Sequence, residues 1–128
     1  MSSKVGAIAE QKFKLHCLER EIPVLEPVLD NFGIDFVVKK GSRFVSIQVK
    51  STLRKDPSRN SYKVTIVRGF NGRAYNKGDY DYLVVYIFEL ATWYIIPEKE
   101  IKATTIRLNP SSDKTKYSKY KEAWQLLK

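Results

Sequence analysis

The sequence has very little cysteine or histidine, with one residue of each, Cys17 and His16. A single cysteine excludes an intramolecular disulfide, and these two residues have too few companions to form a zinc site. No apolar run approaches the ~20 residues of a membrane-spanning helix, and the first residues are polar, unlike a signal peptide. These absences predict a cytoplasmic protein that does not associate with a membrane.

Acidic residues are also scarce, since 14 Asp and Glu stand against 23 Lys and Arg, for a formal net charge of +9. This balance favours a polyanionic partner, and nucleic acid is the leading candidate. A basic protein of the membrane surface is the competing class. The 128 residues have the size of one ordinary domain. We therefore expect residues 1–128 to form a single domain that binds double-stranded DNA and is associated with the nucleoid.

Residues 33–52 have the pattern of a β-hairpin with polar side chains on one face. Two apolar runs, 34–38 and 44–49, flank Lys39-Lys40-Gly41-Ser42, a break typical of the turn between antiparallel strands. Side chains alternate between the two faces of a strand. The face predicted for the core carries Val45, Ile47 and Val49, and the face predicted to line a cleft carries Ser46, Gln48 and Lys50.

Asp35 stands inside the first apolar run, between Ile34 and Phe36. A carboxylate in a buried-strand pattern is costly unless a partner compensates its charge. A metal ion or a lysine can do so. The hairpin therefore predicts a functional site that contains Asp35.

An acid on one strand, followed on the next by an acid or amide and a lysine two residues apart, resembles the PD-(D/E)XK nuclease superfamily. Asp35 matches the motif aspartate, Gln48 the second acidic position and Lys50 the lysine. Ile34 stands where the family often has proline. A glutamine in this motif is similar to the Gln-x-Lys of certain intron-encoded homing endonucleases. The resemblance implies an α/β, restriction-endonuclease-like fold, with a central mixed β-sheet flanked by helices.

Residues 3–20 are predicted to form the first helix, with Ser2 or Ser3 as its cap. Glu10 lies at the edge of its apolar stripe. Gly6-x-x-x-Glu10 is similar to the first-helix motif of many of these nucleases, which implies that Glu10 helps to bind metal. A solvated glutamate is the alternative. The stripe itself, in which His16 and Cys17 are assigned to packing, consists of Val5, Ile8, Ala9, Phe13, His16 and Cys17.

Hydrolysis of a phosphodiester needs a nucleophilic water, neutralisation of the phosphoryl oxygens and help for the leaving oxygen, all of which a divalent metal can supply. Oxygen-only ligands favour Mg²⁺ or Mn²⁺. Asp35 is the expected principal ligand, and Lys50 is expected to orient the attacking water or stabilise developing charge. The remaining expected ligands are Gln48 through its side-chain oxygen, Val49 through its backbone carbonyl, and Glu10.

Two further segments are predicted to contact DNA. Ser51 and Thr52 can donate hydrogen bonds to a phosphate. Residues 68–78 mix three glycines, three cations and two aromatics, a composition suited to a phosphate backbone and to base stacking. The contact residues expected there are Arg68, Arg73, Tyr75 and Lys77.

The rest of the chain predicts strands at 22–28, 62–67, 80–88, 92–96 and 104–108, one helical turn at 98–101 and a C-terminal helix at about 113–127. The strand at 22–28 is expected at a sheet edge, because prolines flank it. Asp79 and Asp81 are assigned a capping or turn role rather than metal binding. The helix would carry a stripe that serves as core or as a subunit interface, formed by Tyr117, Tyr120, Trp124 and Leu127.

These features together predict a metal-dependent endonuclease of duplex DNA, site-specific and of the homing or restriction-like type. One alternative is a Holliday-junction resolvase. Another is a non-catalytic DNA-binding protein on a degenerate nuclease fold, with Gln48 as the sign of lost activity. Because one domain carries a single cleft, cleavage of both strands predicts a homo-oligomer, either a dimer or a tetramer.

Overall fold

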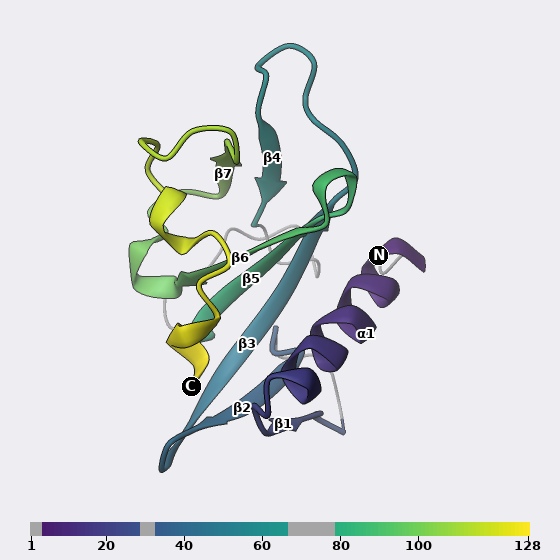
Figure 1. Ribbon diagram of the computed structural model, residues 1–128, viewed down its shortest axis with the longest axis vertical. Helices are drawn as coiled ribbons and strands as arrows, with labels where there is room; N and C mark the ends of the chain where they lie inside the picture. The colour runs from purple at the N-terminus through teal and green to yellow at the C-terminus, as the bar shows by residue number, and fades with distance from the viewer. Residues whose placement is uncertain (1–3, 29–32, 67–78) are drawn as a thin grey trace.

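The computed structural model describes residues 4–28, 33–66 and 79–128. A five-stranded sheet forms its centre, with strand order β1-β2-β3-β5-β6, and a smaller sheet pairs β4 with β7 (Figure 1). β3 and β5 are parallel and the other neighbours are antiparallel, so the central sheet is mixed as expected. The elements are α1 (Lys4–Glu19), β1 (Val24–Leu25), β2 (Phe36–Lys40), β3 (Arg43–Thr52), β4 (Tyr62–Thr65), β5 (Tyr82–Ile87), β6 (Thr92–Pro97) and β7 (Thr105–Leu108).

Two apolar cores lie on the two faces of the central sheet. On one face α1 packs its buried side chains, Ala9, Phe13 and Cys17, against the inward residues of β3. On the other face the β4–β7 sheet covers Leu83 and Val85 of β5. The predicted alternation along β3 is confirmed, because Val45, Ile47 and Val49 are buried whereas Ser46, Gln48 and Lys50 are half-buried.

The hairpin predicted at 33–52 is present. Lys40 pairs with Arg43, so Gly41 and Ser42 form a two-residue turn. Gly41 has a φ of +61°, a left-handed conformation that glycine adopts without steric cost. The edge strand predicted at 22–28 is shortened to Val24–Leu25 and pairs with β2 alone.

The C-terminal helix predicted at 113–127 is wrong. The segment has only two short 3₁₀ turns, Ser118–Tyr120 and Trp124–Leu127, and it lies along the edge strand β6. Glu122, with a φ of +51°, breaks any helix and exchanges hydrogen bonds with Trp93: its N–H donates to the Trp93 carbonyl at 2.7 Å and its carboxylate accepts from the Trp93 N–H at 3.0 Å. Pairing with the open sheet edge thus outweighs the helical spacing of the aromatics.

The aromatic stripe considered as a subunit interface is core instead. Tyr117, Tyr120 and Trp124 are only 6%, 9% and 5% exposed. The other predicted elements are present with small changes of bounds, and Glu98–Glu100 forms the expected single turn. Within the described parts of the chain, no helix is long and apolar enough to cross a membrane.

Candidate active site

Asp35 is fixed between the two strands of the hairpin. It immediately precedes β2, and its N–H donates to the Ile47 carbonyl at 2.8 Å. One oxygen of its carboxylate accepts the backbone N–H of Val49 at 2.7 Å. The pairing of β2 with β3 begins at Phe36 and Ile47, and Asp35 donates to the carbonyl of the same Ile47. Because Val49 separates Gln48 from Lys50, the bond to Val49 brings the Asp35 carboxylate to the stretch of β3 that carries both residues.

Lys50 lies on the same face of β3 as Gln48, two residues further along. β2 pairs only with residues 43–47 of β3, and from Val49 onward the regular partner is β5 alone. The candidate site therefore lies at the beginning of β2, where β3 continues beyond its pairing with that strand. Asp35, Gln48 and Lys50 are each half-buried, shielded from bulk water but still accessible.

Gly33 lies beside Gln48, at the beginning of the segment predicted to form the hairpin. Its φ is +78°, a conformation that favours glycine. A Cβ atom added at Gly33 would lie 3.8 Å from the side-chain nitrogen of Gln48. The signal available in the sequence was the position of this glycine, two residues before the motif aspartate.

Glu10 approaches the sheet from the helical layer. It stands three and seven residues before Phe13 and Cys17, which are both fully buried, so it lies on the side of α1 that faces the sheet. Its side chain is half-buried. Asp35, Gln48 and Lys50 thus come from one hairpin, whereas Glu10 comes from α1, which packs on the sheet face opposite to the one that carries Gln48 and Lys50.

The donor set suits a hard cation. It offers carboxylate, amide and backbone carbonyl oxygens, and Mg²⁺ accepts one or two carboxylates because it retains several waters. Among the residues that the structure describes, no group of three or more His, Cys, Asp or Glu side chains is placed to hold a metal ion. Any site on this hairpin must therefore use Gln48 or the backbone in addition to carboxylates.

Ser51 and Thr52 end β3, and alternation places them on opposite faces of the sheet. Thr52 is on the side of Lys50, and Ser51 is on the side that α1 covers. Both are half-buried. The other expected DNA contacts, Arg68, Arg73, Tyr75 and Lys77, lie outside the described residues.

Asp81 has the structural role expected of it. Its carboxylate accepts the Ser46 N–H at 2.8 Å and the Ser46 hydroxyl at 3.3 Å, and its own N–H donates to the Ser46 carbonyl at 3.0 Å. These bonds join the beginning of β5 to β3. They hold β3 and β5 in register next to the residues of the candidate site.

His16 and Cys17 serve packing, as predicted: Cys17 is buried in the core, and the half-buried His16 packs on two tryptophan rings. Burial raises the pKa of the Cys17 thiol to about 12, so it is not a nucleophile at neutral pH. The His16 ring lies 5.5 Å from the Trp124 ring and 5.4 Å from the Trp93 ring. Burial and the nearby Arg20 charge lower the pKa of His16.

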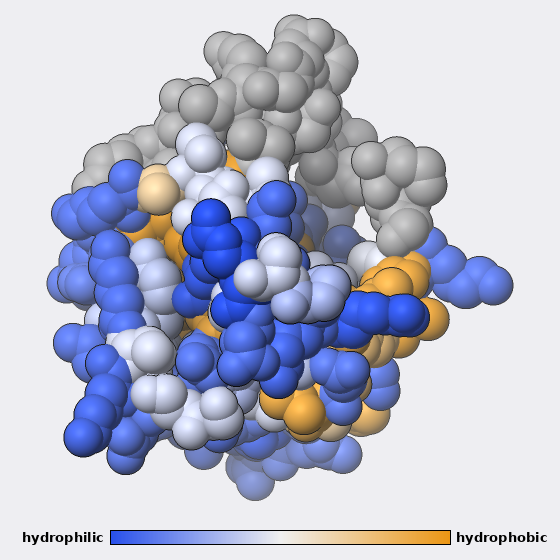
Figure 2. Space-filling model, turned by 90° about the horizontal axis from the view of Figure 1, so that it is seen from above, coloured by the Kyte–Doolittle hydropathy of each residue, from blue (hydrophilic) through white to orange (hydrophobic). Residues whose placement is uncertain are grey.

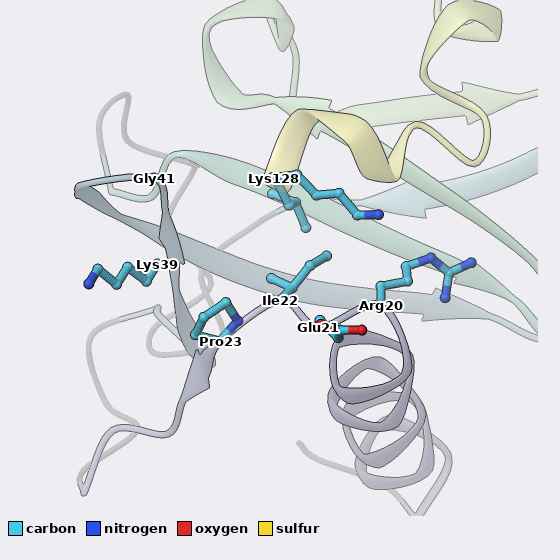
Figure 3. Close-up of a pocket in the computed structure, with 8 residues that line it drawn as sticks. Arg20, Glu21, Ile22, Pro23, Lys39, Gly41 and Lys128 are labelled. Atoms are coloured by element: carbon cyan, nitrogen blue, oxygen red, sulfur yellow. The ribbon is translucent and has the colours of Figure 1, made fainter.

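A pocket of about 370 Å³ lies away from the candidate site, at the turn end of the hairpin. Figure 3 shows that its walls come from the end of α1, the β2–β3 turn and the C-terminal segment. Its charged residues include Arg20, Lys39 and Lys128. None of the residues predicted for catalysis or metal binding lines it.

The sequence profile of the PD-(D/E)XK endonucleases matches residues 1–127. The chain belongs to this endonuclease family. No curated protein sequence matches it significantly.

Two solved structures are similar to this PD-(D/E)XK endonuclease. A bacterial homing endonuclease, I-Ssp6803I, is 28% identical, with a TM-score of 0.82 over 98% of this chain and 93% of that one. The Holliday junction resolvase Hjc of Archaeoglobus fulgidus is 16% identical, with a TM-score of 0.54 over 81% of this chain and 84% of that one. At that identity the second likeness shows the shared fold alone.

These findings confirm the family and the restriction-endonuclease-like fold expected from Asp35, Gln48 and Lys50. The assignment of Gln48 to the second acidic position of the motif stays a prediction. On that assignment the hairpin presents one carboxylate, that of Asp35, where the usual motif presents two.

Proposed function

We propose that this endonuclease hydrolyses phosphodiester bonds of duplex DNA with Mg²⁺ or Mn²⁺, and that it is site-specific. The observation that carries the proposal is the bond of the Asp35 carboxylate to the backbone N–H of Val49, the residue between Gln48 and Lys50. The likeness to I-Ssp6803I supports the homing type. The net charge of +9 supports a polyanionic substrate.

Asp35, Gln48, Val49 and Glu10 are the residues proposed to hold the ion. When bound, it would supply Lewis-acid activation of water and neutralisation of phosphoryl charge. The N–H and C=O of one residue in an extended strand point to the same side. Because the Val49 N–H reaches Asp35, the Val49 carbonyl is directed toward that acid as well.

Lys50 is proposed as the residue that orients the attacking water or stabilises charge on the phosphoryl oxygens. Lys50 is half-buried, and partial exclusion of water around a site strengthens the interaction of a cation with an anion. Gln48 contributes an oxygen but no charge. The site should consequently hold its ion more weakly than a site with two hairpin carboxylates.

We also propose that the active form is a homodimer, because each chain offers one candidate site and a duplex has two strands to cut. The supporting surface is the outer face of α1, where Ile8, Leu15 and Leu18 are 40%, 53% and 62% exposed. Figure 2 shows apolar residues at the surface on the side of the molecule that α1 occupies in Figure 1.

Charge complementarity favours a second copy of this chain as the occupant of that face. Two antiparallel α1 helices related by a twofold axis that set Ile8 against Leu15 also set Lys4 against Glu19. Both of these charged residues are exposed. Each contact occurs twice in such an isologous interface.

A cleavage assay on long genomic DNA tests the function. We expect a limited set of fragments with Mg²⁺ or Mn²⁺ and intact DNA with EDTA. Absence of cleavage with either ion over a range of concentrations would contradict the proposal. If four-way junctions compete for binding to the protein better than the cleaved linear duplex does, the resolvase alternative is supported instead.

A further inference from the structure

The connection from β3 to β4, together with the first two residues of β4, forms a basic arm, defined here as residues 53–63. It carries four exposed cations and a single acid, Asp56. In Figure 1 it forms the upper end of the molecule, and Figure 2 looks down on that end, where hydrophilic residues dominate the surface facing the viewer. The exposed cations are Arg54, Lys55, Arg59 and Lys63.

The tip of the arm is held by Asp56. Its N–H donates to the Ser61 carbonyl at 2.8 Å, and its carboxylate accepts the Ser58 N–H at 3.0 Å and the Ser58 hydroxyl at 2.8 Å. Arg107 of β7 donates to the same carboxylate at 3.1 Å. Asn60, with a φ of +53°, closes the turn by donating its N–H to the Asp56 carbonyl at 3.0 Å. The only acid of the arm is thus engaged in holding its shape.

The base of the arm is held by Glu89, which follows β5. The Glu89 N–H donates to the Leu53 carbonyl at 3.2 Å, and the Tyr62 hydroxyl donates to the Glu89 carboxylate at 2.5 Å. The backbone N–H of Lys55 also bonds that carboxylate. Both ends of the arm are therefore joined to the rest of the fold, while its cations remain exposed.

The arm follows the candidate site directly. Leu53 is three residues after Lys50, which corresponds to about 10 Å along an extended strand. Successive phosphates of one DNA strand are about 3.4 Å apart along the helix axis. The first cation of the arm therefore lies within roughly three or four phosphates of a DNA strand bound at Lys50.

We propose that this arm binds the DNA backbone next to the phosphate that is cut, with Arg54, Lys55 and Arg59 neutralising phosphates. The inference rests on the proposed function for its substrate, but DNA binding is measurable without cleavage. A preorganised arm suits this role because little conformational freedom is lost on binding. Its contacts position the duplex and do not read bases.

The test compares two triple variants with the wild type in binding to a duplex that contains the cleaved sequence, or to random-sequence duplex if no cleavage is found. EDTA is present throughout. The arm variant is Arg54→Gln, Lys55→Gln and Arg59→Gln. The matched control is Lys39→Gln, Arg43→Gln and Lys128→Gln, three exposed cations at the turn end of the hairpin, about 30 Å along β3 from the arm. Thermal unfolding verifies that both variants fold.

We expect the arm variant to bind at least about tenfold more weakly and to lose about 2 to 3 units from the slope of log K against log salt, since each phosphate contact contributes about 0.9. The control should keep the wild-type slope. An unchanged slope in the arm variant, or an equal loss in the control, overturns the inference.

The two proposals fail in different ways. A wild type that cleaves DNA while the arm variant binds normally contradicts the arm and leaves the function intact. A wild type that never cleaves, but whose binding depends on the arm, supports the arm and contradicts the function.

Discussion

The backbone N–H of Val49 donates a hydrogen bond of 2.7 Å to the carboxylate of Asp35. This bond joins the acid before β2 to the residue that separates Gln48 from Lys50. The orientation of the proposed ligand thus depends on the backbone of the strand that carries the proposed catalytic lysine. Substitutions on this hairpin should consequently affect cleavage much more than folding.

Lys50→Ala should lower the cleavage rate by about 10²- to 10³-fold, the usual loss when one group that stabilises developing charge is removed. The midpoint of thermal unfolding should change little, because Lys50 is half-buried and faces the site rather than the α1 core. Single-turnover cleavage and a thermal melt measure the two effects. A cleavage rate near that of the wild type would remove Lys50 from the mechanism.

Gln48→Glu should lower the concentration of Mg²⁺ needed for half-maximal cleavage, because it adds a second carboxylate to the hairpin. Gln48→Ala, which removes the oxygen ligand altogether, should raise that concentration and slow cleavage. The cleavage rates of the wild type and the two variants, measured over a range of Mg²⁺ concentrations, test both expectations. Should the wild type be inactive and only Gln48→Glu cut DNA, the chain would instead be a DNA-binding protein on a degenerate nuclease fold.

His16 should make stability fall at acidic pH. Burial against Trp93 and Trp124 and the charge of Arg20 lower its pKa in the folded state, so protonation favours the unfolded chain. The loss begins as pH drops through the unfolded value of about 6.5 and continues toward the lower folded value. Urea unfolding of the wild type at pH 7.5 and 5.5 measures the effect.

His16→Gln is the matched control for that pH dependence, since its side chain does not titrate. The charged groups that act on His16 are Lys12 and Glu19 of α1, Arg20 directly after α1, and Glu122 of the C-terminal segment. They are unchanged in the variant. A variant that loses as much stability as the wild type between the two pH values would assign the effect to other groups.

Leu18→Lys should convert a dimer to a monomer, because it places a charge in the proposed α1 interface. The variant should nick duplex DNA and no longer produce double-strand breaks. Light scattering and supercoiled-plasmid cleavage give the two readouts. Phe44→Lys is a control of similar exposure on β3, with 61% of the residue exposed against 62% for Leu18. A wild type that is monomeric both free and bound to its duplex contradicts the dimer.

The hairpin was predictable from the sequence because its information is local. Alternation predicted the faces of β3, and the two-residue turn at Gly41 set the register that brings the Asp35 carboxylate to Val49, between Gln48 and Lys50. The C-terminal segment was not predictable in this way. Tyr117, Tyr120 and Trp124 have helical spacing, but they are buried along the edge of β6 through contacts of Glu122 with Trp93, a long-range pairing that no local pattern encodes.

The position of Glu10 was predictable only in part. Helical periodicity placed it at the edge of the apolar stripe, and its half-buried side chain in the structure agrees. Its relation to Asp35 depends on how α1 crosses the sheet, which the sequence does not state. The basic arm was visible as composition, but the hydrogen bonds of Asp56 and Glu89 that hold it come from residues far apart in the chain.

The most direct test of the central claim is single-turnover cleavage of duplex DNA by the wild type and by Asp35→Asn, with and without Mg²⁺. Asn at this position keeps an oxygen that can accept the Val49 N–H, so the fold and DNA binding should be preserved while the charge is lost. We predict metal-dependent cleavage by the wild type and a loss of at least about 10²-fold in the variant. Equal cleavage by the two proteins, or wild-type cleavage that persists in EDTA, would contradict a metal site built on Asp35.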